Sequence, residues 1–504
     1  MRKSKRKKNR VLLRNQEAKN GKKVHLDEMR EIRGGCFEKR EDGCERKMKR
    51  VGNEKSPMRI LWASEQPIRP TGYGTVSREI IKRLVKKGHE VFVMGWDYNG
   101  EDWTHEEGWT LVHTGMSGFG RELALGDTTI LEVNLMRIKP DVYMSLIDPW
   151  FTGHAVRSTN RMGIPFVSYM PVDGFPISYS WKDIMKMTHT PLWMSHFGKN
   201  TFEEFIDSYS STGSAPKELR DPILDRYHKE TTDVLYHGVD TSVFKPITQS
   251  EKEQAKRDLQ IDHFDFMFCS VGRNTNRKQI PRLLEAFQDF LSHLSTKERK
   301  RVGLVLHCGD PSDTAGMGGW DLPGMVRQMG LHRNVVFTDN GNNPLHGISR
   351  EELALVYGMC DVHILATGGE GFGIPSVEAM SCGLPVILPD NSTGPELVGH
   401  SPIISKASDF DRFMRGNRGW IVQNATNITG PKWGVKMGLV SIEGLTNSML
   451  DAYQNPDLVN ELGEKAREWC VDNLDWDIIA DQTEKILKEA IDRPHPLGEN
   501  ARRL

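Results

Sequence analysis

The stretch LATGGEGFGIPSVEAMSCGLPVI, residues 365–387, carries an acidic residue on each side of a segment rich in glycine. An apolar strand is predicted to end at Thr367, and Pro375 is well placed to open a helix, where its missing N–H costs nothing. Glycines between them let backbone N–H groups turn toward a ligand, and a helix N-terminus beyond such a loop favours phosphate. Because Glu370 lies on the loop and Glu378 lies about one turn into the helix, we expect them to touch different parts of one ligand. Carboxylates suit the hydroxyls of a ribose or hexose, although Glu378 could instead only stabilise the helix N-terminus by its charge.

This order of strand, glycine loop and helix recurs from Met58 onward. Residues 58–64, MRILWAS, predict a buried strand, and TGYGTVSREIIKRLVKKGHEV after them predicts a glycine turn, an amphipathic helix and a second strand. Further strands are predicted at 141–147, 165–171, 266–273, 302–308, 334–339, 361–367 and 385–389, with helices at 183–187, 281–294, 349–360 and from 375. The alternation predicts two doubly wound α/β halves in tandem, joined around residues 241–256.

Two cations and a second glycine turn add to the candidate site. Arg273 follows a predicted strand and Lys278 precedes a helix, at the edge of a parallel sheet where α/β proteins bind ligands. The pair suits a diphosphate, and the alternative is solvated surface charge. Gly72 and Gly74 form the turn in the first half, which tight packing explains nearly as well as ligand binding.

Composition restricts the class of protein. A chain of 504 residues is long enough for two or three domains, and no run of about 18 apolar residues is present that could span a membrane. The N-terminus is basic but no apolar segment of a signal peptide follows it. The seven cysteines are scattered, which favours a reducing compartment over a disulfide framework or a zinc site. We therefore expect a cytoplasmic protein.

Charge is unevenly distributed along the chain. Residues 1–57 hold 20 lysines and arginines against 9 acidic residues, whereas the whole chain has a net charge of −1. This basic extension has few large apolar residues, so we expect it to be largely disordered or loosely helical. It is either a solvated tail or a contact for an anionic surface, which would place the protein peripherally at a membrane. Nucleic acid is a poor partner for the acidic remainder.

Five motifs, which occur along the chain in the family's order, resemble those of glycosyltransferase family 4, whose members are retaining enzymes with the GT-B fold. EGFGIPSVEAMSCGLPVI is similar to the E-x7-E signature of that family, and GRNTNRK followed by LLEAF is similar to its donor-phosphate segment. The other three are GYGTVSREIIKRLVKKGHEV, YHGVDTSVFKP and NLDWDIIADQTEKIL, which resemble its glycine loop, its interdomain stretch and its C-terminal segment. The resemblance covers about residues 58–490.

The resemblance implies a division of the chain into four parts. Residues 1–57 form the basic extension, and residues 58–245 form an acceptor-side Rossmann-like domain. Residues 246–470 form the domain that binds a nucleotide-sugar donor. Residues 471–504 form a helix that packs back on the first domain.

Roles follow residue by residue from the family pattern. Glu370 would hold donor-sugar hydroxyls and Glu378 the ribose diol, while Arg273 and Lys278 would neutralise the departing diphosphate. The backbone of Gly371, Phe372, Gly373 and Ile374 would meet the sugar and phosphate, and Gly72 or Gly74 would let the first domain close over the diphosphate. This arrangement needs no metal ion and no cofactor, because cations and a helix dipole neutralise the charge.

The sequence departs from the family pattern on the acceptor side. Many members carry a His-Asp pair after the corresponding strand, and here PFVSYMPVDGFPIS supplies only Asp173, which is equally explained as a turn residue. Asp148 and His154 are substitutes outside any motif. Two D-x-D matches, 409–411 and 475–477, adjoin no donor segment, so we interpret both as structural.

The resemblance thus implies a retaining glycosyltransferase that moves a hexose-type sugar from a UDP- or GDP-linked donor to a hydroxyl acceptor, by front-face substitution and without metal. The acceptor is a glycan, a lipid-linked glycan or a protein. Two alternatives stay open: a sugar-nucleotide epimerase of the same fold, and a non-catalytic protein that binds glycan or nucleic acid through its basic extension. Donor base, sugar, acceptor, linkage and oligomeric state are not determined by the sequence.

Overall fold

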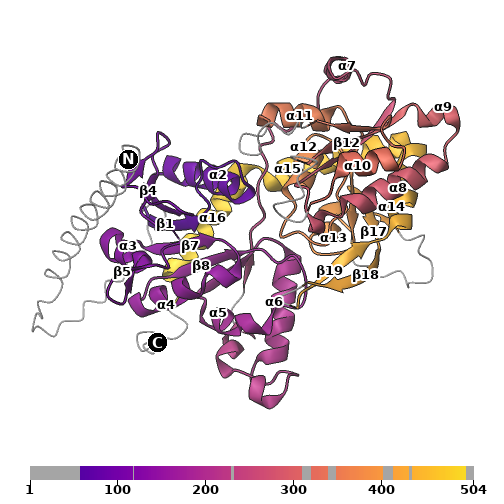
Figure 1. Cartoon of the computed structure of the whole chain (residues 1–504). Helices are drawn as coiled ribbons and strands as arrows, with labels where there is room; N and C mark the ends of the chain where they lie inside the picture. The colour runs from indigo at the N-terminus through magenta and orange to yellow at the C-terminus, as the bar shows by residue number, and fades with distance from the viewer. Residues whose placement is uncertain are drawn as a thin grey trace, which may run out of the picture.

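The chain forms two α/β domains that face each other (Figure 1). The computed structural model describes residues 57–494, apart from 117, 229–231, 309–318, 339–347, 401–412 and 431–433. The basic extension, except Pro57, therefore lies outside the described residues, as do Asp409 and Asp411.

The first domain is built on a sheet that is parallel except for its edge strand β3. In spatial order its strands are β10 (Asp233–Val234), β9 (Thr190–Trp193), β8 (Phe166–Met170), β7 (Val142–Leu146), β1 (Arg59–Ser64), β2 (Glu90–Gly95), β4 (Thr110–Val112) and β3 (Trp103–Thr104). Its helices are α2 (Gly72–Lys86), α3 (Ile130–Ile138), α4 (Gly153–Met162), α5 (Lys182–Met187) and α6 (His196–Tyr209), with a small ribbon of β5 (Leu123–Leu125) and β6 (Thr128–Thr129).

The second domain repeats this architecture, with an antiparallel edge strand β16. Its order is β13 (Val335–Phe337), β12 (Val302–His307), β11 (Phe266–Val271), β14 (Val362–Ile364), β15 (Val386–Pro389), β17 (Gly419–Val422) and β16 (Phe413–Arg415). Its helices are α7 (Gln249–Asp258), α8 (Ile280–Ser292), α9 (Thr296–Arg299), α10 (Leu322–Gln328), α11 (Arg350–Gly358), α12 (Ile374–Ser381), α13 (Gly394–Val398), α14 (Ile442–Gln454) and α15 (Pro456–Leu474). A separate hairpin of β18 (Asn424–Thr429) and β19 (Lys436–Val440) follows β17.

The central strands are mostly apolar because both faces of each strand are buried. In β1, Ile60 and Trp62 belong to one hydrophobic cluster, and Leu61 and Ala63 belong to another on the opposite face. The order of pairing reverses beside β1, which lies between β2 and β7, and again beside β11, which lies between β12 and β14. Ligands of open α/β sheets bind at the carboxyl ends of strands at such reversals. The loops after β1, β7, β11 and β14 therefore define the cleft.

The chain crosses between the domains twice, and the two crossings are joined. The N–H of Val239 donates to the carbonyl of Leu474 (2.8 Å), and the hydroxyl of Thr241 donates to Asp475 (2.6 Å). Helix α16 (Trp476–Asp492) then returns to pack against α2 of the first domain, as the yellow ribbon in Figure 1 shows.

The strands and helices predicted from sequence are confirmed within one or two residues at nearly every position, and so is the GT-B-like pair of doubly wound sheets. The hairpin β18–β19 was not predicted. None of the helices in the described ranges is long and apolar enough to cross a membrane.

Candidate active site

The centre of the cleft is the side chain of Glu370, on the loop between β14 and α12. Its Oε1 accepts hydrogen bonds from Lys278 Nζ (2.8 Å) and from the hydroxyl of Thr367 (2.7 Å), and it lies 2.9 Å from a guanidinium nitrogen of Arg277. Arg277 and Lys278 are held by the short 3₁₀ turn Asn276–Lys278 after β11, at the neighbouring strand end. Two cations and one buried carboxylate thus share the switch point of the second sheet.

Burial and charge have opposite effects on the Glu370 carboxyl. Burial raises its pKa, but attraction to Lys278 and Arg277 and the hydrogen bonds from Lys278 and Thr367 outweigh that effect and lower the pKa to about 2. Burial lowers the pKa of Lys278 despite its contact with Glu370. The carboxylate is therefore ionised at neutral pH and can accept hydrogen bonds from hydroxyl groups.

The loop beyond Glu370 presents backbone N–H groups to the cleft. Gly373 precedes α12 with φ of 102°, a left-handed conformation that favours glycine, and no side chain caps the helix. Within the described residues, no hydrogen bond from the N–H of Gly371, Phe372 or Gly373 to another residue is found. The ring of Phe372 is buried against Tyr236 and His237, so this residue offers its backbone to the cleft. Such a helix start is suited to an anion.

Glu378 lies on α12, where its carboxylate accepts a hydrogen bond from the hydroxyl of Tyr357 (3.1 Å) on α11. Burial raises the pKa of Glu378 to about 7, and the Tyr357 contact and the charge of Arg350 only partly oppose this. Glu370 and Glu378 are thus separate carboxylates with opposite pKa shifts. That they serve different parts of one ligand stays a prediction.

The glycines of both domains meet across the cleft. A Cβ on Gly369 would lie 1.8 Å from the carbonyl oxygen of Asp173, and a Cβ on Gly371 would lie 2.7 Å from Pro171. Gly72 faces Ile374 across the same gap, so the N-termini of α2 and α12 are neighbours. Gly74 has a different role, because a Cβ there would lie 2.4 Å from the carbonyl oxygen of Arg69 within its own turn.

The first domain contributes carboxyl groups to this cleft. Burial and repulsion from Asp173 raise the pKa of Asp148 to about 6, against the hydrogen bond from the hydroxyl of Tyr73 (3.4 Å). Burial raises the pKa of Asp173 as well, while the charge of Arg277 lowers it. Arg277 therefore acts electrostatically on carboxyl groups of both domains.

Not all of the residues predicted from the sequence lie in the charged cluster around Glu370. Lys278, Glu370 and Asp173 lie together, but Arg273 is exposed and forms no ion pair or hydrogen bond with another described residue. Arg277 and Thr367 were missed, and only the adjacency of Arg277 to Lys278 gave a signal. His154 is buried and its Nε2 bonds the carbonyl of Phe119 (2.9 Å), which explains it by packing.

The D-x-D segment at 475–477, which the structure describes, forms the start of α16 and contacts α2. Asp475 accepts from the N–H of Asp477 (2.9 Å) at the start of the helix, and Asp477 pairs with Arg83 on α2. In the part of the chain that is described, His, Cys, Asp and Glu side chains form no group of three that could hold a metal ion.

Comparison with known proteins agrees with the fold. Residues 251–416 match the family described as "Glycosyl transferases group 1". The chain is 26% identical to alpha-maltose-1-phosphate synthase of Mycolicibacterium smegmatis over 344 residues, 68% of this chain and 77% of that protein. It is 29% identical to D-inositol 3-phosphate glycosyltransferase of Corynebacterium diphtheriae over 204 residues, which are 38% of this chain and 44% of that protein.

Solved structures show the same architecture. Sucrose-phosphate synthase from Thermosynechococcus elongatus superimposes with a TM-score of 0.61 at 15% identity, covering 86% of this chain and 99% of that one. HepE of Anabaena, in complex with UDP-glucose, gives a TM-score of 0.58 at 14% identity and covers 86% and 100%. The fold and the cleft define a GT-B protein. The family match over residues 251–416 and these relatives support a GT4-type glycosyltransferase.

Proposed function

We propose that this glycosyltransferase transfers a hexose-type sugar from a nucleotide-diphosphate sugar to a hydroxyl acceptor, with retention of configuration. The observation that carries the proposal is the buried Glu370 beside Lys278 and Arg277, next to the uncapped start of α12. A sugar diphosphate combines the groups that such a site recognises, namely hydroxyls for the carboxylate and negative charge for the cations and the helix dipole.

Glu370 would hold the sugar hydroxyls, and the backbone of residues 371–374 would meet the sugar and the diphosphate. Glu378 would accept hydrogen bonds from the ribose diol. Lys278, Arg273 and the newly found Arg277 would neutralise the diphosphate as the glycosidic C–O bond breaks. Three cations and a helix dipole supply this stabilisation without a metal ion or cofactor.

Retention follows from front-face substitution in this proposal. The leaving phosphate oxygen takes the proton of the acceptor hydroxyl while that hydroxyl oxygen bonds to the anomeric carbon on the same face. The protein holds both partners close and stabilises the charge that develops on the leaving group. Asp173, and Asp148, whose pKa it raises, would serve the acceptor side.

UDP is the favoured nucleotide because HepE, which shares the fold, was solved with UDP-glucose, and GDP is the alternative. Calorimetric titration with UDP, GDP and ADP, with EDTA present and beside Glu378→Ala, tests the donor site. We expect one diphosphate to bind and the variant to bind it at least about tenfold more weakly, a loss of ~1.4 kcal/mol. Absence of binding at millimolar concentration would contradict the donor site and favour the glycan-binding alternative.

A further inference from the structure

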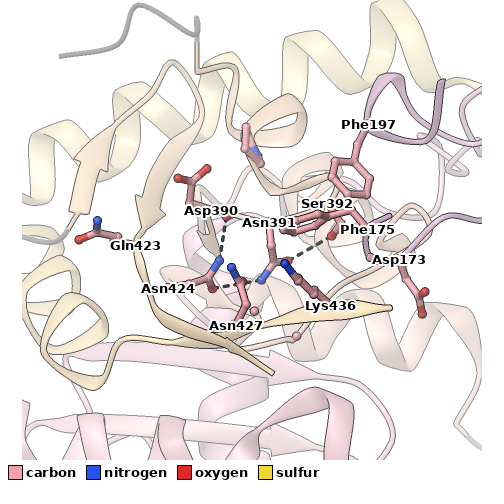
Figure 2. A pocket seen from close by; sticks show the side chains of 14 residues that line it. Asp173, Phe175, Phe197, Asp390, Asn391, Ser392, Gln423, Asn424, Asn427 and Lys436 are labelled. Atoms are coloured by element: carbon pink, nitrogen blue, oxygen red, sulfur yellow. Dashed lines mark hydrogen bonds between the residues drawn. The ribbon is translucent and has the colours of Figure 1, made fainter. Parts of the chain in front are cut away.

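A cavity of about 380 Å³ lies between the two domains, beside the loop between β14 and α12, which we call the donor loop (Figure 2). We call it the hairpin cavity, because one wall is the hairpin β18–β19. The loop after β15, residues 390–395, forms a second wall, and Asp173, Gly174, Phe175 and Phe197 of the first domain complete it. This volume is within the range of small-molecule sites, roughly 300–1,000 Å³.

The cavity is fixed rigidly to the donor loop. The N–H of Gly438 donates to the carbonyl of Gly368 (2.9 Å), and the side chain of Gln279 bonds both Gly438 and Val440 on β19. Ser392, in the second wall, accepts from the N–H of Glu370 (2.9 Å). A ligand in the hairpin cavity is therefore one residue layer away from Glu370.

Both domains are needed to form the cavity. Phe175 and Lys436 exchange backbone hydrogen bonds across the interface, from Phe175 N–H to Lys436 O (3.2 Å) and from Lys436 N–H to Phe175 O (2.7 Å). Gly174 allows this approach, since a Cβ there would lie 2.5 Å from the carbonyl oxygen of Lys436. The cavity is thus complete only when the first domain touches the hairpin.

Its polar groups are of mixed kinds. Figure 2 shows the side chains of Asn427 and Lys436 rising from the hairpin toward Asn391. Neither of these two side chains, nor the carboxylate of Asp390, has a hydrogen-bond partner within the described ranges. An amide that donates and accepts, an ammonium that donates and a carboxylate that accepts match a ligand with many hydroxyls. One cation, Lys436, beside two acidic residues, Asp390 and Asp173, does not favour a phosphate.

We propose that the hairpin cavity is a saccharide subsite that binds a neutral sugar of the acceptor through Asn427, Lys436 and Asp390, with the rings of Phe175 and Phe197 against its apolar face. The proposal rests on the transferase function given above. It locates acceptor recognition on a hairpin of the donor domain as well as on the first domain. Because Lys436 also pairs with Phe175 through its backbone, removing its side chain loses the cation–π contact with the Phe175 ring but keeps the interdomain backbone hydrogen bonds.

The test uses the full chain with Asn427→Ala/Lys436→Ala and the matched control Thr426→Ala. Thr426 is exposed on the same strand, and its neighbour Asn427 points to the opposite face. Labelled protein is applied to immobilised neutral, phosphorylated and uronic-acid oligosaccharides. UDP is present at about 1 mM, which would fill most of a donor site whose Kd is about 0.1 mM. We expect wild type and the control to bind a neutral saccharide, and the double variant to bind it at least about tenfold more weakly, a loss of ~1.4 kcal/mol.

Equal binding by the double variant, binding of charged saccharides alone, or no binding by wild type would each overturn the subsite. Calorimetry with UDP separates this outcome from failure of the donor site. If all three proteins bind UDP equally, the donor site stands whatever the array shows. If wild type binds no nucleotide, the proposed function fails independently of the hairpin cavity.

Discussion

The Nζ atom of Lys278 lies 2.8 Å from Oε1 of Glu370, and about one-tenth of each side chain is exposed. The two residues come from neighbouring strand ends, β11 and β14, which are paired in the sheet. A buried ion pair of this kind fixes both side chains before any ligand arrives. Removing one partner leaves the other charge buried and less well compensated.

Lys278→Ala is therefore expected to affect both stability and turnover. We expect the melting temperature to fall by about 5 °C or more, since breaking a buried pair costs roughly 3 kcal/mol, and turnover to fall at least about tenfold. Scanning calorimetry and release of the nucleotide diphosphate from the donor measure the two effects. The double variant Lys278→Ala/Glu370→Ala should melt above Lys278→Ala, because it removes the less well compensated charge of Glu370. An unchanged melting temperature in Lys278→Ala contradicts this account of the pair.

Arg273→Ala should separate catalysis from stability. Arg273 is exposed and pairs with no other described residue, so its loss should change the melting temperature by about 1 °C or less. Turnover should still fall at least about tenfold if its charge stabilises the leaving diphosphate. Arg327→Ala, another exposed arginine on α10, is the matched control and should keep normal turnover. Normal turnover in both Arg273→Ala and Lys278→Ala would exclude the diphosphate assignment.

Nucleotide binding should depend on pH through Glu378. Burial raises its pKa to about 7, so the free protein at pH 6 holds this carboxyl mostly protonated. A protonated carboxyl accepts hydrogen bonds less well than a carboxylate, so binding of the ribose diol should strengthen as the pH rises from 6 to 8 and then level off. The Kd for UDP measured by calorimetry at pH 6, 7 and 8 tests this. Glu378→Gln should bind more weakly and lose the dependence, and a wild-type Kd that is flat over this range would remove Glu378 from the ribose.

Glu396 connects the domains at the start of α6. Its carboxylate accepts hydrogen bonds from the N–H groups of His196 (3.0 Å) and Phe197 (2.6 Å) and from the hydroxyl of Tyr236 (3.0 Å). A glutamate of the second domain thus caps a helix of the first. Glu396→Ala should lower stability by about 1–2 kcal/mol and increase the radius of gyration in small-angle scattering. Tyr236→Phe keeps both backbone bonds and should change the radius of gyration less, whereas equal radii for wild type and Glu396→Ala would show that this contact does not hold the domains together.

The fold could be predicted because its signals are local. Buried parallel strands such as β1 and β11 are continuous apolar runs, and Thr71, Gly88 and Pro375 mark the ends of helices in the sequence itself. Hairpin β18–β19 was missed because the residues of β18 are mostly polar and exposed. Its register depends on contacts with Gly368 and Phe175, far away in the sequence.

Part of the site could be predicted for the same reason. Glu370 and Lys278 stand in recognisable segments, but which neighbouring cation reaches Glu370 depends on the turn at Asn276–Lys278 and on the pairing of β11 with β14. Sequence reasoning therefore could not choose between Arg273 and Arg277. The opposite pKa shifts of Glu370 and Glu378 were equally inaccessible, because they depend on whether a cation or only Tyr357 lies within reach.

The joined crossings at Val239 and Asp475 give the two domains a common hinge axis. Two tethers that separate independently would allow sliding and twisting, but tethers bonded to each other leave rotation about one line as the easy motion. The axis passes near the junction of α15 and α16, whereas the hairpin β18–β19 lies at the other end of the interface (Figure 1). A small rotation about this axis would displace Phe175 and Lys436 the most, because they lie farthest from it. We therefore expect the distance between Phe175 and Lys436 to change more than that between other interdomain contacts when the two domains rotate about this axis.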